Sequence, residues 1–202
     1  MKTRCCIFSF AFATFFASQL YAQDPQLSQY YAAPLYLNPS FAGNTLQSRL
    51  IANYRHQWAA IPGAFISYAF SYDHNLQGIN SGAGFMAMHD KAGTGGLRFT
   101  NLAGFYAYTA QLNRKLVLKP GVSFSYTFRN INFADLTFGD QLIHGGGNSS
   151  ENPVEPVSYV DAAAGLLLYS EKFWFGSALH HLNKPNQSLV GGITRLPIKF
   201  SI

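Results

Sequence analysis

Histidines are the first residues in this sequence whose type and spacing could do chemistry, since they serve as metal ligands and general bases. His180 and His181 are adjacent, so in a strand their side chains should point to opposite faces and cannot share one metal ion. No two of the remaining four have the i, i+4 spacing of a helical zinc site; they are His56, His74, His89 and His144. We therefore expect no metal site, and we interpret His180 and His181 as structural polar residues near the rim of a sheet.

The chain also contains residues that partly match hydrolase and phosphate-binding motifs. His180, Asn183 and the serines Ser67 and Ser123 supply the residue types of a hydrolase, but no G-x-S-x-G elbow is present. The glycines of KAGTGG, Gly93, Gly95 and Gly96, are not followed by the Lys-Ser or Lys-Thr of a phosphate-binding loop, so they indicate a turn. We expect a protein that is not an enzyme, with no catalytic residue and no cofactor. A membrane-embedded lipid hydrolase is kept as a lesser alternative.

The elements that would position such residues are long strands with alternating side chains. Between Leu116 and Arg129, one face is apolar and aromatic, as in Phe124, Tyr126 and Phe128, and the other carries Ser123, Ser125 and Thr127. A strand of this length is typical of a membrane-crossing strand, which needs about 9 to 11 residues when tilted, whereas soluble strands usually have about five or six. The apolar face therefore indicates contact with lipid.

Similar patterns recur along the chain and give seven strand candidates. They lie near 49–58, 64–73, 81–90, 98–112, 116–129, 159–170 and 172–182. If the chain enters from the periplasmic side, the turns at 113–115 and 170–171 are tight, whereas the connections at 130–158 and 183–195 are long. Outer-membrane barrels alternate short turns and long loops in this way. The fold expected is all-β, an antiparallel transmembrane β-barrel of the outer-membrane type.

Composition supports an exported protein of this class. Charged residues are 11% and aromatic residues 16%, and the formal net charge of +5 is scattered, which indicates no nucleic-acid partner. Residues 1–22 have Lys2 and Arg4 before an uncharged segment too short for a spanning helix, which predicts a cleaved signal peptide. Both cysteines, Cys5 and Cys6, lie inside it, so the domain at 23–202 contains no disulfide.

The segment at 23–48, called the lead-in below, precedes the first strand and does not alternate. Pro25, Pro34 and Pro39 exclude a continuous helix there. Its aromatic residues need a covering surface, so they either line the interior near the periplasmic mouth or dock a periplasmic partner. The candidates for docking are Tyr30, Tyr31, Tyr36, Asn38, Pro39 and Phe41. The basic positions on the polar faces are expected to form ladders with acidic residues rather than an anion pathway; they are Arg49, Arg55, Lys119 and Arg129.

Two further segments bear on the architecture. The long connection at 130–158 includes a flexible stretch at Gly145–Ser150 and exceeds what a compact domain usually leaves structureless, so it is expected to face a partner. An eighth strand begins within 194–201 and is not completed before Ile202. We expect either a C-terminally truncated chain, and hence an incomplete barrel, or a partner that completes the sheet.

Four segments of the chain stand out together: QDPQLSQYYAAPLYLNPSFAG at 23–43, NYRHQWAAIPGAFISYAFSYD at 53–73, LTFGDQL at 136–142 and HHLNKPNQSL at 180–189. In this order they resemble the PorP/SprF family of type IX secretion proteins from Bacteroidetes. The resemblance implies an outer-membrane β-barrel, in contact with lipid, that acts in secretion and gliding motility. It also implies a periplasmic lipoprotein or machinery partner and the export or surface attachment of adhesin-like proteins. The alternative from the residues alone is a secreted soluble β-sandwich that binds glycans or protein.

Overall fold

The computed structural model describes residues 24–25, 27–93, 96–132, 136, 139–143, 156–189 and 192–202. The predicted signal peptide at 1–22 and the glycine stretch at 145–150 lie outside these residues. Nearly all described residues beyond position 47 belong to one antiparallel sheet or its connections. The predicted all-β antiparallel fold is therefore confirmed.

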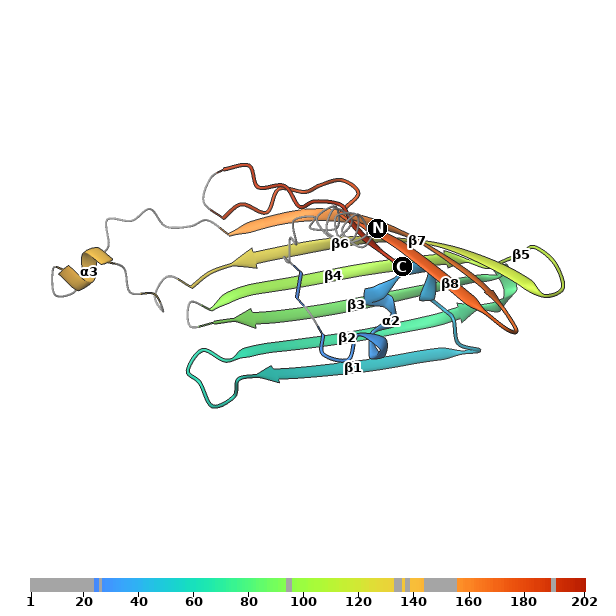
Figure 1. The fold of residues 1–202 in the computed structure, drawn as a ribbon, viewed down its shortest axis with the longest axis horizontal. Coiled ribbons are helices and arrows are strands. Elements are labelled where there is room, and N and C mark those ends of the chain that lie inside the picture. Colours follow the sequence, from blue (N-terminus) through green and yellow to red (C-terminus); the bar gives the residue numbers. More distant parts are fainter. Residues whose placement is uncertain are drawn as a thin grey trace, which may run out of the picture.

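The sheet has nine strands in the order β1-β2-β3-β4-β6-β7-β8-β9, with β5 added beside β6. Figure 1 shows β7 and β8 curling across the face on which the blue lead-in lies. The sheet is open, because β1 and β9 stand at the two ends of the strand order within the described residues. The strands are β1 (Ser48–Gln57), β2 (Phe65–Leu76), β3 (Ser81–Ala92), β4 (Leu97–Tyr108), β5 (Ala110–Gln111), β6 (Leu116–Asn130), β7 (Val157–Ser170), β8 (Trp174–His180) and β9 (Lys199–Ser201).

All seven strand predictions are confirmed to within a few residues, although the fourth is interrupted after Tyr108 and continues as β5. The short 3-10 helix η3 (Gln77–Ile79) turns the chain between β2 and β3, and Ser170 and Phe173 close the turn between β7 and β8. The long connection after β6 is not structureless, because it contains helix α3 (Gly139–Ile143). We call the end with η3 the short-turn end and the opposite end the long-loop end.

Alternation of side chains separates two faces of the sheet. Phe70, Ala87, Leu102, Tyr126 and Val160 are consecutive partners across β2, β3, β4, β6 and β7, and the large members of this row are exposed. The row beside it on the other face contains no aromatic residue: it consists of Ser71, Met86, Ala103, Ser125 and Asp161. We call the face that carries the first of these rows the aromatic face. A soluble sandwich would bury such a face under a second sheet, whereas here its large side chains are exposed. Strands of 12 to 15 residues in β2, β3, β4, β6 and β7 are long enough to cross a bilayer.

Lipid contact of the aromatic face is testable at Phe124, which lies midway along β6 with 64% of its surface exposed. Phe124→Arg should lower the stability of the inserted protein by about 2–4 kcal/mol, because a cation at the membrane midplane loses its hydration. Tyr108→Arg, at the end of β4, should cost only about 0–1 kcal/mol near the interface. Denaturant titration of the protein folded into vesicles measures both, and equal costs would contradict lipid contact.

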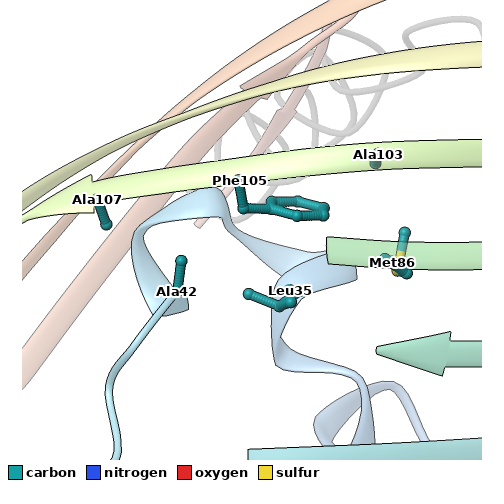
Figure 2. Packing of buried hydrophobic residues seen from close by; sticks show 6 residues of the cluster. All are labelled: Leu35, Ala42, Met86, Ala103, Phe105 and Ala107. Carbon is teal, nitrogen blue, oxygen red and sulfur yellow. The ribbon is translucent and has the colours of Figure 1, made fainter. Parts of the chain in front are cut away.

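The opposite face of the sheet, called the concave face below, carries the lead-in. Its three short helices are separated by prolines as the sequence predicts: η1 (Tyr30–Ala32), α2 (Pro34–Leu37) and η2 (Pro39–Phe41). Leu35 and Ala42 pack there with side chains from β3 and β4, which are Met86, Ala103, Phe105 and Ala107 (Figure 2). The buried core of the described chain is thus the contact between the lead-in and the sheet. Among the described residues, no helix has the length and apolar character needed to cross a membrane.

Candidate functional site

A row of small residues crosses the concave face near the short-turn end. Gly82, Ala107, Gly121, Gly165 and Ala178 are consecutive partners across β3, β4, β6, β7 and β8. The lead-in lies directly on this row, since a Cβ on Gly121 would come within 2.5 Å of the Ser40 backbone nitrogen, and one on Gly82 within 2.1 Å of the Ala42 carbonyl oxygen. Because these five residues lack bulky side chains, residues 38–43 lie directly against the backbone of the sheet. The five residues are called the small-residue row below.

Asn38 attaches the lead-in to β7 and β8, at one end of the small-residue row. Its side-chain amide donates to the Ser177 carbonyl oxygen at 2.9 Å and to the Leu166 carbonyl oxygen at 3.4 Å. Its side-chain oxygen accepts the Ser40 N–H at 2.9 Å and caps η2, while Pro39 occupies the first helical position, has no N–H and so needs no acceptor. The tripeptide Asn38-Pro39-Ser40 thus forms a capped turn whose remaining hydrogen bonds reach β7 and β8.

Asp73 holds the other end of the same segment. Its carboxylate, 1% exposed, accepts the Gly43 N–H at 2.9 Å and pairs with Arg49 through hydrogen bonds of 2.9 and 3.2 Å. Arg49 also donates to the Phe41 carbonyl oxygen, and the buried Lys119 interacts electrostatically with Asp73. Of the predicted ladder of basic residues, Arg49 therefore has an acidic partner, whereas Arg129 donates to the amide oxygen of Gln187.

A second charged cluster joins the start of the lead-in to the long-loop half of the sheet. His181 bonds to Asp161 at 2.8 Å and to Asp24 at 3.2 Å, and Lys199 donates to Asp24 at 3.0 Å. Burial by itself lowers the pKa of His181, but the hydrogen bonds to Asp161 and Asp24 outweigh it and raise the pKa to about 9. Burial opposes ionisation of Asp24, yet bonds to His181 and Lys199 hold the pKa of Asp24 well below its usual range. At neutral pH the cluster is an ion pair network.

The six docking candidates occupy two different environments. Tyr30 and Tyr31 are exposed, at 63% and 69%, with their rings edge to face at 5.9 Å. The other four lie against the sheet: Tyr36 packs on the core cluster and its hydroxyl donates to the Pro25 carbonyl oxygen, Asn38 and Pro39 are buried, and Phe41 is half-buried. Docking of a partner by this set stays a prediction, and only Tyr30 and Tyr31 present large free surfaces for it.

The prediction that His180 and His181 point to opposite faces is wrong. The strand ends at His180, whose Nε2 lies 3.3 Å from the Leu37 carbonyl oxygen on the concave face, and His181 follows with a φ of 60°. That left-handed backbone breaks the alternation, so both rings lie on the concave side with centroids 6.4 Å apart. No group of three or more histidine, cysteine or acidic residues suited to a metal ion is found in the described ranges.

The residue types of a hydrolase have separate partners. Ser67 donates to Asp90, His180 meets the Leu37 carbonyl oxygen, and the Asn183 amide donates to the Val160 carbonyl oxygen. None of these three contacts joins Ser67 to His180 as a nucleophile and its base would be joined.

Sequence reasoning missed the small-residue row and the Asp24 cluster. Glycine inside a strand was a usable signal, because it weakens a strand and often marks close approach of another backbone. Gly82, Gly84, Gly121, Gly165 and Gly176 all stand in predicted strands, but only the register between strands shows that three of them share one row. Asp24 gave no signal, since its partners lie 157 and 175 residues away in the chain.

Comparison with known families gives one match over most of the chain. A family model described as type IX secretion system membrane protein PorP/SprF matches residues 19–202. No curated protein and no solved structure matched the sequence. The match includes both the lead-in and the whole described sheet.

Proposed function

Because this chain belongs to the PorP/SprF family of type IX secretion system membrane proteins, we propose that it acts in the outer membrane as a non-enzymatic β-barrel component of that system. The bare aromatic face supports this location, because lipid is the environment in which exposed Phe70, Leu102 and Phe124 are stable. The proposal includes gliding motility, which the family resemblance implies, and a cleaved signal peptide, which residues 1–22 predict.

The proposed role is docking rather than chemistry. Tyr30 and Tyr31 form an exposed aromatic pair in η1, which has no buried residue and directly precedes the buried Ala33 and Leu35. Tyrosine is enriched at protein interfaces because it offers large contact area and a polar end. We propose a periplasmic lipoprotein or machinery component of type IX secretion as this partner, and help in the export or surface attachment of adhesin-like proteins as the result. The observation that supports the docking role is this exposed tyrosine pair, in a chain whose family model describes a membrane protein of the secretion system.

The first test is location. The mature protein should be found in the outer membrane fraction, be extracted only with detergent, and migrate differently on gels before and after heating. Deletion of its gene should reduce adhesin-like proteins on the cell surface. A soluble periplasmic monomer, or an unchanged cell surface after deletion, would contradict the proposal.

The second test concerns the aromatic pair. Tyr30→Ala with Tyr31→Ala should abolish cross-linking to the periplasmic lipoprotein while the protein still folds, because the lost aromatic surface is outside the core. The matched control is Tyr54→Ala with Tyr68→Ala, a second exposed pair with centroids 5.2 Å apart on the aromatic face. If both double variants bind the lipoprotein like the wild type, Tyr30 and Tyr31 are not its docking site.

A further inference from the structure

A row of residues that contains two cations borders the aromatic face at the long-loop end. Its members, called the basic row below, are consecutive partners across β1, β2, β3, β4 and β6: His56, Ile66, Lys91, Arg98 and Asn130. Each member is four residues along its strand from a member of the exposed row through Phe70, so alternation places the basic row on the aromatic face. Arg98 is exposed and Lys91 is half-buried.

Lys91 and Arg98 have no acidic partner in the sheet. They are direct cross-strand partners with the same charge, and none of the ion pairs within the described residues includes either of them. Asp90, next to Lys91 in the chain, lies on the concave face, where it accepts a hydrogen bond from Ser67. Like charges directly opposite each other destabilise a sheet. An anion bound between the two cations would remove this repulsion.

The aromatic side chains nearest the basic row are of the kind found at a membrane interface. Tyr54 and Tyr68 are exposed cross-strand partners in the next row, with ring centroids 5.2 Å apart. Trp58 follows β1 and packs edge to face on Phe65, also with 5.2 Å between the centroids. Tyrosine and tryptophan form girdles where the hydrocarbon of a membrane meets the headgroups. With the aromatic face in lipid, the basic row therefore lies at the height of the headgroups.

A groove with a volume of about 450 Å³ lies on the hydrocarbon side of the basic row. Tyr68 and Phe70 line it, and its lining on the aromatic face comes from the two rows next to the basic row. Ala52 and Ala87, the cross-strand partners of Phe70, also line it, and their small side chains keep it open. A groove of this size and apolar lining on a lipid-facing surface suits an acyl chain.

We propose that the long-loop border of the aromatic face binds one phosphorylated lipid, with a phosphate between Lys91 and Arg98 and an acyl chain in the groove beside Phe70. The inference rests on the proposed outer-membrane location and adds a specific lipid site to it. Long loops of outer-membrane barrels face the outside of the cell, so the lipid belongs to the outer leaflet. Lipid A, which carries phosphates and acyl chains on sugars, has the required chemistry.

Binding of diphosphoryl lipid A to the purified full chain can be measured by native mass spectrometry in a maltoside detergent, which contains no phosphate. The wild type should bind one lipid A molecule. Lys91→Gln and Arg98→Gln should each weaken binding about fivefold, and the double variant about thirtyfold, since a factor of five corresponds to the roughly 1 kcal/mol that one basic residue contributes near anionic lipid. Lipid A without phosphates should bind the wild type and the double variant equally weakly.

Arg114→Gln with Lys115→Gln is the matched control, because it removes two adjacent exposed cations from a turn at the short-turn end. Its affinity for lipid A should equal that of the wild type. An equal loss in this control and in the Lys91 and Arg98 double variant would assign the attraction to total charge and overturn the site. Inorganic phosphate that binds as tightly as lipid A would show a free-ion site and overturn the assignment to a lipid.

Lys91→Glu separates lipid binding from a structural role of the cation pair. The new carboxylate would face Arg98 across the two strands, where opposite charges stabilise a sheet. The variant should therefore resist urea at least as well as the wild type, while it binds lipid A more weakly than Lys91→Gln does. A variant that loses stability and retains lipid A binding would overturn the proposal.

The groove is tested by filling it. Ala87→Phe should weaken lipid A binding about tenfold, the effect of keeping about two methylene groups of the acyl chain out of the groove. Ala83→Phe, on the same face of β3 but outside the groove lining, is the control and should bind like the wild type. Equal affinities of the two variants would overturn the place given to the acyl chain.

Cell fractionation decides the proposed location separately from these measurements. An outer-membrane protein that does not bind lipid A would overturn the lipid site and leave the proposed function standing. A soluble periplasmic protein would overturn the proposed function, and the affinities of the Lys91 and Arg98 variants would still decide the lipid site.

Discussion

Replacing Gly121 by alanine should detach the lead-in and cost more than about 3 kcal/mol of stability, at or beyond the upper end of ordinary overpacking. The added Cβ would lie 2.5 Å from the Ser40 backbone nitrogen and 2.6 Å from the Ser40 Cα. Neither the β6 backbone nor the capped turn can yield without breaking hydrogen bonds, because both are tied to neighbouring strands. The buried contact of Ala42 and Leu35 with the sheet would be lost with it.

The same substitution at Gly104 provides the control. Gly104 is in β4, opposite Phe85 and Phe124 on the aromatic face, and a Cβ there would meet nothing within 4 Å. Gly104→Ala should therefore be neutral or stabilising by roughly 0.5 kcal/mol, through the smaller entropy of the unfolded chain. Urea titration followed by tryptophan fluorescence compares the two variants. Equal stabilities would show that the lead-in does not rest on the small-residue row.

Removal of the Asp73 carboxylate is expected to have the second large effect. Asp73→Ala should cost about 3–5 kcal/mol, the range for breaking a buried ion pair by deleting one partner. It would leave Arg49 and Lys119 without their acidic neighbour and the Gly43 N–H without its acceptor. The lead-in should then become sensitive to protease at residues 38–47, where it passes from the small-residue row into β1.

Arg49→Met tests whether the two partners of the Arg49–Asp73 ion pair contribute unequally. It should lower the free energy of unfolding by less than Asp73→Ala does. Asp73 would keep the Gly43 N–H and the charge of Lys119, whereas deletion of the carboxylate leaves two cations together. Asp73→Asn should be intermediate, because an amide oxygen can still accept one hydrogen bond. The three variants are ranked by the same urea titration, and a larger loss in Arg49→Met would contradict the central role given to Asp73.

Several features of this protein follow from its sequence alone. Alternation with a period of two is a local property, so the strands, their two faces and the exposed aromatic side could be predicted near the observed residues. Pro34 and Pro39 likewise limited the lead-in to short helices, because proline lacks the N–H that a continuing helix needs. The resemblance to the PorP/SprF family could also be seen in this single sequence, and the family match over residues 19–202 confirms it.

Other features were decided only by tertiary structure. The small-residue row exists because pairing register aligns Gly82, Gly121 and Gly165 with Ala107, and register is a relation between strands rather than a property of any one of them. His181 joins the concave face because its backbone turns left-handed where β8 ends, which a strand pattern does not anticipate. Asp24 meets Lys199 only because the folded sheet brings both ends of the described chain together, since no local pattern encodes an ion pair across 175 residues.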